Sequence, residues 1–358
     1  MGSNPTPSAN KNADQDTRIC IRSAFSSYVK YRGSSTNKHI VLIGGKMKRT
    51  TKIGIVLASI VLLLSFSVLI AKHYKKISEI GVPDTIPYGF GKDATVILLA
   101  GQSNASGWSR DDYLQKNVSE EKYAEYEHGY DNVYINFRAA ANNSRGFVPC
   151  SVRQGEGLDA TFFGPELGLA EKLNELYPDR TFFIIKFAWG GTDLYEEWRS
   201  PSSGGEEGPL YRSFVDHVKT SVAYLETKNY NVSIEGMCWM QGESDSTSDE
   251  ATLEYEKNLS CLIDDVRREF SDYASEDGIA FVDAYIMDII FWKNYAQINQ
   301  AKQNVANSSE MNAVIDTIAH GLCTTEEPEE EPDLAHFDSL SAIKLGHLFA
   351  EAASNFFD

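Results

Sequence analysis

The sequence predicts an α/β protein in which helices cover both faces of a mostly parallel, five-stranded sheet, preceded by one N-terminal transmembrane helix. Three observations lead to this prediction. From Ala94 onward, short apolar segments alternate with amphipathic ones, as in parallel sheets buried between helices. With 42% hydrophobic and 23% charged residues, the 358-residue chain has the composition of a globular domain. Before that domain, residues 53–71 form an uncharged apolar segment.

Strands are expected where apolar runs lack helical periodicity, and helices where apolar residues recur on one face. The expected strands are Thr95–Ala100, Asn132–Phe137, Phe182–Ala188, Ile234–Met240 and Ile279–Ala284. The expected helices are Glu120–Glu127, Gly164–Leu176, Tyr211–Thr227, Glu250–Tyr273, Asn294–Asn307 and a last helix from about Leu340 to Phe356. No repeat and no second linker interrupts residues 94–358, so we expect one domain there. Ligands of such sheets bind beyond the carboxyl ends of the strands.

The charge of the chain is strongly asymmetric. Through Lys76 there are 13 basic and 2 acidic residues, which gives +11, whereas the remainder has 20 and 49, which gives −29. The acidic body argues against nucleic acid as a partner, because such binding requires neutralised phosphates. We expect residues 1–52 to be a disordered basic tail and 72–93 to be a stalk. Met47 resembles a start of its own, so residues 1–46 belong either to the protein or to an extended gene model.

Residues 53–71 are long enough to cross a membrane as a helix. The alternative is a cleaved signal peptide, which also has basic residues before an apolar run and would release a secreted protein. The length of the run and the absence of a small-residue cleavage site favour an uncleaved signal-anchor. The more basic N-terminal segment would then remain in the cytoplasm and the acidic domain would lie outside it.

Cysteines and histidines suggest no metal site. Five cysteines are too few for a disulfide scaffold, and no C-x-x-C pair occurs. Cys238 lies in an apolar strand and Cys261 in a helix pattern, so we expect buried free thiols there. A disulfide among Cys150, Cys238, Cys261 and Cys323 remains open, because the outside compartment permits one.

A serine follows the first expected strand, in the sequence AGQSNASG. Ser103 stands beside small residues that permit a tight turn, as a nucleophile requires. The alternative role is that of a helix N-cap. The third strand ends in AWGGTDL, where Gly190 and Gly191 let the backbone present N–H groups to an oxyanion, or simply form a turn.

Two further segments carry polar groups at the same edge of the sheet. The fourth strand ends in WMQGESD, where the amide of Gln241 faces the same cleft and Glu243 and Asp245 are carboxylates of open role. Near the C-terminus, PDLAHFDS places Asp333 three residues before His336. That spacing lets the carboxylate hold one imidazole nitrogen while the other faces a substrate. The four segments together contain what acyl transfer needs.

These segments resemble the SGNH hydrolase superfamily, and within it the sialate O-acetylesterase-like branch that includes family-six carbohydrate esterases of the acetylxylan esterase type. The resemblance extends over most of residues 94–358 and rests on GQSN, FGPELGLAEKL at 163–173, GGTDL, QGESD and DLAHF. It implies a flavodoxin-like three-layer α/β/α sandwich, a serine esterase acting on acetylated glycans, and no metal or organic cofactor, and it does not cover residues 1–93.

The resemblance also implies residue roles. Ser103 would be the nucleophile, His336 the general base and Asp333 its orienting acid. The N–H groups of Ser103 and of Gly190 or Gly191, with the Gln241 amide, would form the oxyanion hole. We expect Asn104, Glu243 and Trp189 to support the site or contact the substrate; packing in the core is the alternative for Trp189 and Trp198.

Three questions remain open at this level. The same triad serves a sugar O-acyltransferase, and a catalytically inactive carbohydrate-binding module is the alternative from a different class, although such a module needs no triad. The acidic segment Glu326–Asp333 would favour neutral glycans if it lines the cleft, and is otherwise a solvated loop. The glycan, the acetylated position and the oligomeric state do not follow from the sequence.

Overall fold

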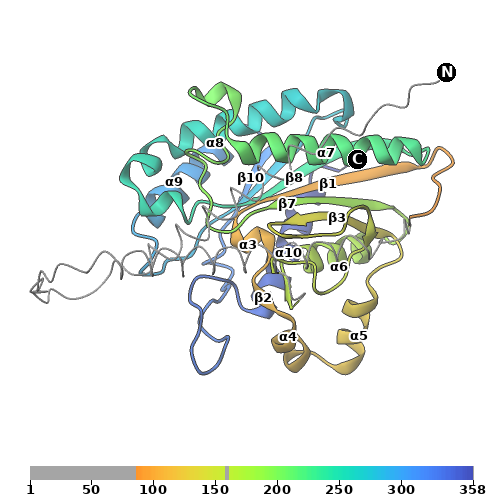
Figure 1. The fold of residues 1–358 in the computed structure, drawn as a ribbon, viewed down its shortest axis with the longest axis horizontal. Helices are drawn as coiled ribbons and strands as arrows, with labels where there is room; N and C mark the ends of the chain where they lie inside the picture. The colour runs from red at the N-terminus through yellow and green to blue at the C-terminus, as the bar shows by residue number, and fades with distance from the viewer. Residues whose placement is uncertain (1–85, 158–160, 358) are drawn as a thin grey trace, which may run out of the picture. The chain divides into compact units, whose positions relative to one another are not determined.

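The computed structural model describes residues 86–157 and 161–357. Its centre is an eight-stranded sheet with the order β10-β9-β8-β1-β7-β3-β4, in which β5 also pairs with β3 (Figure 1). The parallel strands are β1 (Asp93–Gly101), β3 (Val133–Ala139), β7 (Phe182–Ala188), β8 (Asn231–Met240), β9 (Ala280–Ala284) and β10 (Asn312–Ile315). The antiparallel additions are β4 (Asn142–Asn143) and β5 (Val148–Pro149). A separate two-stranded sheet pairs β2 (Ser109–Arg110) with β6 (Phe162–Phe163).

The strand order explains where a site forms. Strands β7-β1-β8-β9-β10 follow the order 2-1-3-4-5 of flavodoxin-like sheets. Strand β3 extends this core beyond β7. After β1 the chain forms β3 and β7 on one side of it and later β8 on the other, so the carboxyl end of β1 is the point where the order reverses. Ligands bind at such switch points.

Helices cover both faces of the sheet, as expected. In Figure 1, α7 (Pro209–Thr227), α8 (Asp249–Glu269) and α9 (Tyr295–Ala306) lie above the sheet. Below it lie α4 (Asp111–Asn117), α5 (Glu120–His128), α6 (Glu166–Leu176) and α10 (Ser339–Ser354). A four-residue helix, α3 (Ser103–Ser106), follows β1 directly. The three-layer α/β/α prediction is therefore confirmed.

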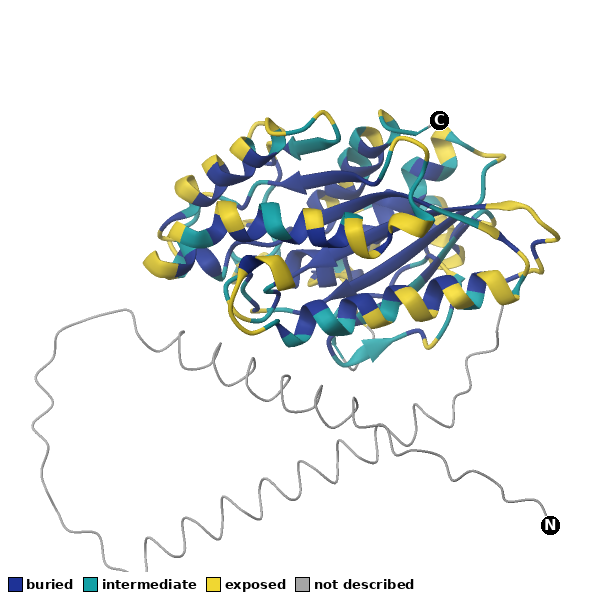
Figure 2. Cartoon of the chain, turned by 90° about the horizontal axis from the view of Figure 1, so that it is seen from above, coloured by how far each residue is buried: buried dark blue, intermediate teal, exposed yellow. Residues whose placement is uncertain are grey.

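Burial follows the pattern from which the strands were predicted. Every residue of β1 from Ala94 to Gly101 is buried, and all of β7 is buried, because both strands have neighbours on each side and helices on each face. Figure 2 shows the strands as a buried centre, with the exposed positions of the helices turned outward. Trp198 also belongs to this core, with its ring against Trp239 at 5.1 Å.

All five predicted strands are present, but the five-stranded count was wrong. Strand β10 was missed because its four residues, NAVI, are mostly half-buried and lack an apolar run. The predicted helix Glu250–Tyr273 ends earlier, at Glu269, and Ser271–Tyr273 form a separate 3₁₀ turn. The short helices α3 and α4 were also missed, because they are too short for periodicity to appear.

Helices α6 and α10 approach each other unusually closely. A Cβ on Gly168 would lie 2.0 Å from the carbonyl oxygen of Ile343, and one on Gly346 would lie 2.1 Å from that of Pro165. Both positions therefore require glycine. Because α10 begins three residues after His336, this contact also fixes the helix that follows the loop carrying the candidate base.

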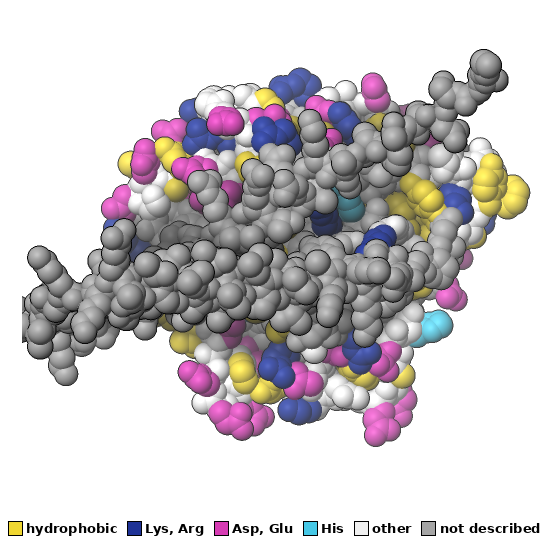
Figure 3. All heavy atoms as spheres, viewed as in Figure 1, with side chains coloured by type: hydrophobic (Ala, Val, Ile, Leu, Met, Phe, Trp, Pro, Cys, Tyr) yellow, Lys and Arg dark blue, Asp and Glu magenta, His cyan; other side chains and the backbone are white. Residues whose placement is uncertain are grey.

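The predictions for residues 1–85 lie outside the described residues: the tail, the transmembrane segment 53–71 and most of the stalk. Among the helices that the structure does describe, we find none with the length and apolar character needed to span a bilayer. Cys150, Cys238, Cys261 and Cys323 are all free thiols. Cys238 is buried as expected, whereas Cys261 is half-buried. On the uncovered margins of the face seen in Figure 3, acidic and basic side chains are interspersed.

Candidate active site

Ser103 lies at the switch point of the sheet, as the first residue of α3. The turn that carries it is tight: Gln102 donates its N–H to the carbonyl of Met240 at 2.9 Å, and a Cβ on Gly101 would lie 2.0 Å from the same oxygen. Gly101 also has φ 140°, which side chains disfavour. Ser103 is 8% exposed and is not an N-cap, since Gln102 occupies that position. The end of β1 therefore places Ser103, which is almost fully buried, at the carboxyl edge of the sheet.

Two backbone N–H groups near this serine are available to a ligand. Among the described residues, neither the Ser103 N–H nor the Gly191 N–H makes a hydrogen bond. Gly191 is exposed and has φ 70°. By contrast, the Gly190 N–H donates to Oε2 of Glu156 at 3.0 Å. Of the two glycines predicted for an oxyanion hole, Gly191 is therefore the one whose N–H remains available to an oxyanion.

The prediction that the Gln241 amide faces the cleft was wrong. Gln241 is fully buried, and its Nε2 lies within hydrogen-bond distance of Asp245 Oδ2 (2.5 Å), the Thr192 carbonyl (3.2 Å) and Gln102 Oε1 (3.3 Å). An amide has two N–H groups, so these acceptors use both. Gln241 thus joins the strand-end loops to one another.

His336 and Asp333 form the expected pair. Nδ1 of His336 lies 2.8 Å from Oδ2 of Asp333, whose Oδ1 accepts from the Ala335 N–H at 3.0 Å. Burial raises the pKa of Asp333, but the hydrogen bond and the charge of His336 outweigh it, so the pKa is lowered overall. The His336 ring is 19% exposed, so its second nitrogen can face a substrate.

Asn104 connects the serine and the histidine. Its Nδ2 donates to the Ala335 carbonyl at 3.2 Å, and its Oδ1 accepts from the Phe337 N–H at 3.0 Å. The side chain next to Ser103 therefore holds the backbone on both sides of His336. No direct Ser103–His336 hydrogen bond occurs in the described structure, but these two contacts keep the residues adjacent.

The two carboxylates of QGESD occupy different places. Asp245 accepts from the N–H groups of Leu194 (2.9 Å) and Tyr195 (3.2 Å), and so holds the loop after Gly191. Glu243 Oε1 accepts from Asn104 Nδ2 at 2.8 Å. Neither contacts the His336 ring, so Asp333 is the carboxylate that orients it.

Three residues of this site were not predicted. Glu156 Oε2 accepts from Ser106 Oγ at 2.5 Å as well as from Gly190, and so connects α3 to the loop that carries Gly190 and Gly191.

Trp108, 36% exposed, stacks on His336 with ring centroids 5.0 Å apart and planes at 13°. Gln102 Oε1 accepts from the N–H groups of Gly242 and Ser244, at 3.3 and 3.2 Å. No sequence pattern marks Glu156; Trp108 was the aromatic nearest the nucleophile motif.

Trp189 packs in the core, which was the alternative to a contact with substrate. It is 3% exposed, and its backbone joins β1 to the glycine loop through a 3.1 Å bond to the Gly101 carbonyl. The exposed aromatic of the site is Trp108 instead.

A second histidine–carboxylate pair lies elsewhere in the domain. His347 Nε2 lies 2.8 Å from Oε2 of Glu171. This pair joins α10 to α6. The Glu171 carboxylate also accepts a hydrogen bond from the Tyr126 hydroxyl and forms an ion pair with Lys122, which indicates a structural role for the His347–Glu171 pair.

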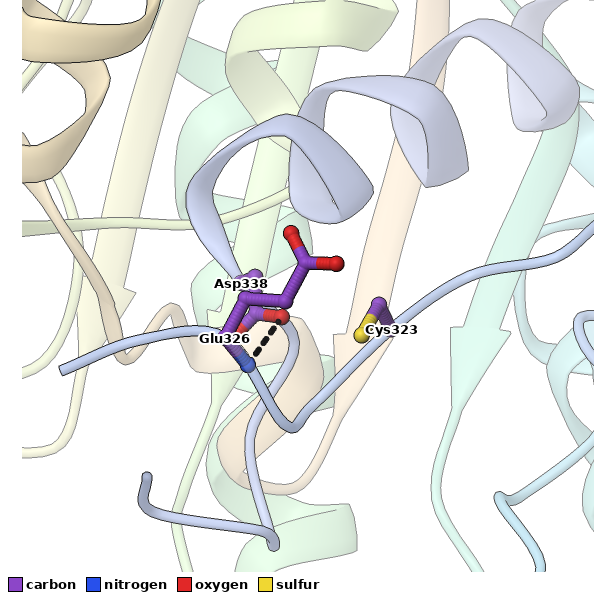
Figure 4. A group of neighbouring side chains, drawn as sticks. All are labelled: Cys323, Glu326 and Asp338. Atoms are coloured by element: carbon purple, nitrogen blue, oxygen red, sulfur yellow. Dashed lines mark hydrogen bonds between the residues drawn. The ribbon is translucent and has the colours of Figure 1, made fainter. Parts of the chain in front are cut away.

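One group of potential metal ligands occurs in the described part of the chain: Cys323, Glu326 and Asp338 (Figure 4). The carboxylate of Asp338 accepts from the N–H groups of Glu326 (3.1 Å) and Glu327 (3.0 Å). These bonds fix the start of the acidic segment to the residue that precedes α10, so Asp338 has a structural role within the protein.

Comparisons with known proteins agree with this geometry. A family model described as carbohydrate esterase, sialic acid-specific acetylesterase, matches residues 93–355. A protein of Escherichia coli (strain K12), named probable 9-O-acetyl-N-acetylneuraminic acid deacetylase, is 28% identical over 189 residues, or 48% of this chain and 56% of that protein. The chain thus matches little more than half the length of this relative.

Two solved structures share the fold. A protein from Arabidopsis thaliana has a TM-score of 0.53 at 17% identity, over 74% of this chain and 99% of that chain. NanS has a TM-score of 0.54 at 19% identity, over 76% and 98%. The family model spans the whole sheet and every segment of the site. The chain therefore belongs to the carbohydrate esterase family described as sialic acid-specific acetylesterases.

Proposed function

We propose that this protein is a serine esterase that removes O-acetyl groups from carbohydrate, with Ser103, His336 and Asp333 as its catalytic triad. The observation that carries the proposal is the pair of Asn104 hydrogen bonds to the backbone on either side of His336. These bonds keep the base next to the nucleophile, while Asp333 holds the imidazole ring. Membership of the esterase family supports acetylated sugar as the substrate.

The proposed reaction has two steps. His336 takes the proton of Ser103 Oγ as that oxygen attacks the ester carbonyl, and then gives the proton to the departing sugar oxygen. An acetyl-enzyme remains. Water, deprotonated by His336, attacks the acetyl-enzyme, and acetate leaves as Ser103 regains its proton. Asp333 stabilises the imidazolium that forms in each step.

The proposed oxyanion hole consists of the Ser103 and Gly191 N–H groups. Both are without partners in the described structure and both lie at the carboxyl edge of the sheet. Loss of one such donor costs roughly 10²–10³ in turnover in other acyl-transfer enzymes. Gln241 contributes indirectly, because its buried amide connects the loops that present these groups.

The acidic segment supports a neutral glycan. Glu326, Glu329, Glu330 and Glu331 are exposed, form no ion pair among the described residues, and lie on the segment that leads to Asp333 and His336. Their charge disfavours approach of an anionic sugar. The Escherichia coli relative, by its name, acts on an acetylated sialic acid, which is an anionic sugar. Rates on neutral and on anionic acetylated sugars therefore decide which of the two is the substrate class of this protein.

A screen of acetate release tests the proposal. The substrates are acetylated xylan, acetylated mannan and O-acetyl sialic acid, each with and without an added acceptor sugar. We expect acetate from wild type, faster from the neutral glycans. No acetate from any of these would contradict the esterase, and acetyl transfer to the acceptor in place of acetate would indicate an acyltransferase.

We further propose that residues 53–71 anchor the protein in a membrane, with residues 94–358 outside the cytoplasm. The support is the uncharged apolar run and the absence of a cleavage site after it.

A further inference from the structure

Glu243 is a buried glutamate beside the catalytic residues that the proposed mechanism does not use. It is 1% exposed, and among the described residues its Oε2 has no hydrogen-bond partner, whereas Oε1 accepts from Asn104. Leaving a buried polar atom unpaired costs free energy, so a fold retains one where it serves a purpose. We propose that Glu243 is a positioning residue that acts through Asn104 to place His336 beside Ser103; this rests on the proposed function.

The first step concerns the rigidity of Glu243. The N–H groups of its neighbours, Gly242 and Ser244, both donate to Gln102 Oε1. The Glu243 carbonyl accepts from Ser246 Oγ at 2.6 Å. Gln102 in turn directly precedes Ser103. The backbone that carries Glu243 is therefore fixed relative to the nucleophile.

The second step concerns the orientation of Asn104. An asparagine amide can turn over and exchange its N–H and C=O sides, and only one orientation satisfies the backbone around His336. The Ala335 carbonyl needs a donor and the Phe337 N–H needs an acceptor. Glu243 Oε1 is an acceptor that faces Nδ2 of Asn104, so it selects the orientation in which Oδ1 faces Phe337.

The protonation state of Glu243 does not change this selection. Burial raises the pKa of Glu243, while the hydrogen bond from Asn104 and the charges of Lys302 and His336 act in the opposite direction. A proton would reside on the unpartnered Oε2, which leaves Oε1 as the acceptor toward Asn104.

The experiment compares two substitutions of Glu243. Glu243→Gln keeps an acceptor oxygen for Asn104, whereas Glu243→Met has nearly the same length and has none. We expect Glu243→Met to lower kcat roughly 10- to 100-fold, as loss of supporting partners does elsewhere, with KM nearly unchanged. Glu243→Gln should recover most of that loss, and both variants are compared at equal folded fraction by thermal unfolding.

Glu235 supplies a matched control. It is a buried glutamate in the middle of β8, the strand that leads into the loop carrying Glu243, and its Oε2 is also unpaired in the described structure. Its Oε1 pairs with Arg180 at 3.1 Å, far along β8 from Ser103. Glu235→Gln and Glu235→Met should alter thermal stability but leave kcat close to wild type.

A double substitution tests the route through Asn104. Asn104→Ala should lower kcat by itself, and adding Glu243→Met should lower it no further. Additive losses would overturn the proposal, as would equal kcat in Glu243→Met and wild type. If Glu243→Met does not fold, an Asn104→Ala enzyme with wild-type kcat would overturn it. Ser103→Ala separates the two proposals when one of these outcomes occurs. If Ser103→Ala keeps full activity, the proposed function is contradicted as well; if Ser103→Ala is inactive, only the positioning role of Glu243 is contradicted.

Discussion

At the residue scale, the central contact is the 2.8 Å bond between Asp333 and His336. The lowered pKa of Asp333 keeps it ionised to more acidic pH than a free aspartate. The stabilisation from this pair is thus present above the unfolded pKa and is lost as pH falls through the folded one. A spacing of three residues in the sequence was enough to predict this contact, because it lies within one turn.

We predict that Asp333→Asn lowers turnover by roughly 10–10³, less than the roughly 10⁴ of the equivalent change in a serine protease, because a partly exposed imidazole keeps some correct orientation. Substrate binding should be retained. Steady-state kinetics of Asp333→Asn, His336→Ala and the double variant measure this. The double variant should be no worse than the worse single one; near-normal turnover in Asp333→Asn would contradict the assignment.

A second residue-scale prediction concerns Asp245. Burial raises its pKa to about 7, the nearby charge of Asp193 adds to this, and the Leu194 and Tyr195 N–H groups and the Gln241 amide oppose it. Between about pH 4 and 7 the folded protein then holds a proton that the unfolded chain has released. The contribution of Asp245 to the free energy of unfolding therefore falls as pH rises through this range.

Asp245→Asn should flatten that pH dependence, since asparagine does not titrate. Denaturant unfolding of the variant and of wild type at a series of pH values measures the slope. Asp272→Asn, an exposed aspartate, serves as the control and should leave the slope unchanged. An identical slope in Asp245→Asn and wild type would show that Asp245 is ionised throughout.

Other residues of the site were beyond prediction from sequence. Glu156 reaches Ser106 and Gly190 from a loop whose path depends on how the strands assemble. Gln241 was expected to face the cleft, but two of the acceptors that surround it, Thr192 and Gln102, are distant in sequence and reach it only in the folded molecule. Local patterns identified the groups that follow a strand directly, and not those whose partners are distant in sequence.

At the element scale, the packing of α10 on α6 determines where the segment before α10 lies. The two helices meet at Gly168 and Gly346 with no room for a methyl group. We predict that Gly346→Ala destabilises the protein by roughly 1–3 kcal/mol, as overpacking does, and lowers turnover by displacing His336. Gly236→Ala is the control, because a Cβ there would lie 3.5 Å from its nearest neighbour. Equal stability of the two variants would contradict this.

A buried ion pair connects β7 to α6. Lys186 Nζ lies 2.7 Å from Glu166 Oε2, both side chains are fully buried, and Nζ also donates to the Gln154 carbonyl at 3.1 Å. Lys186→Met should cost roughly 3–5 kcal/mol, because it leaves Glu166 buried without its cation. Adding Glu166→Gln should recover part of this loss. Chemical denaturation of both variants measures it, and an additive double variant would contradict the coupling.

The elements themselves were largely predictable, for physical reasons. Strands β1 and β7 are buried on both faces, so their sequences are apolar throughout and easily identified. Strand β10 lies at the edge with half-buried residues, and its sequence therefore carries little signal. The strand order also could not be derived from periodicity, since each strand's partners lie elsewhere in the sequence.

At the scale of the whole molecule, the esterase domain accounts for the acidic charge and the preceding region for the basic charge. If residues 53–71 anchor the protein, full-length product should sediment with membranes and resist extraction at high pH, and protease added outside intact cells should release the domain. A chain lacking residues 1–71 provides the control and should remain in the supernatant. Recovery of a mature form that begins near Ala71 would instead indicate a cleaved signal peptide.

The nucleophilic role of Ser103 is tested most directly by trapping the acetyl-enzyme. Wild-type protein and Ser103→Ala are mixed with a chromogenic acetate ester, quenched in acid, digested and weighed by mass spectrometry. We predict one acetyl group on the wild-type peptide that contains Ser103, and neither that group nor catalytic hydrolysis in a folded Ser103→Ala protein. Hydrolysis by Ser103→Ala within tenfold of wild type, or an acetyl group on another residue that turns over at the catalytic rate, would contradict the assignment.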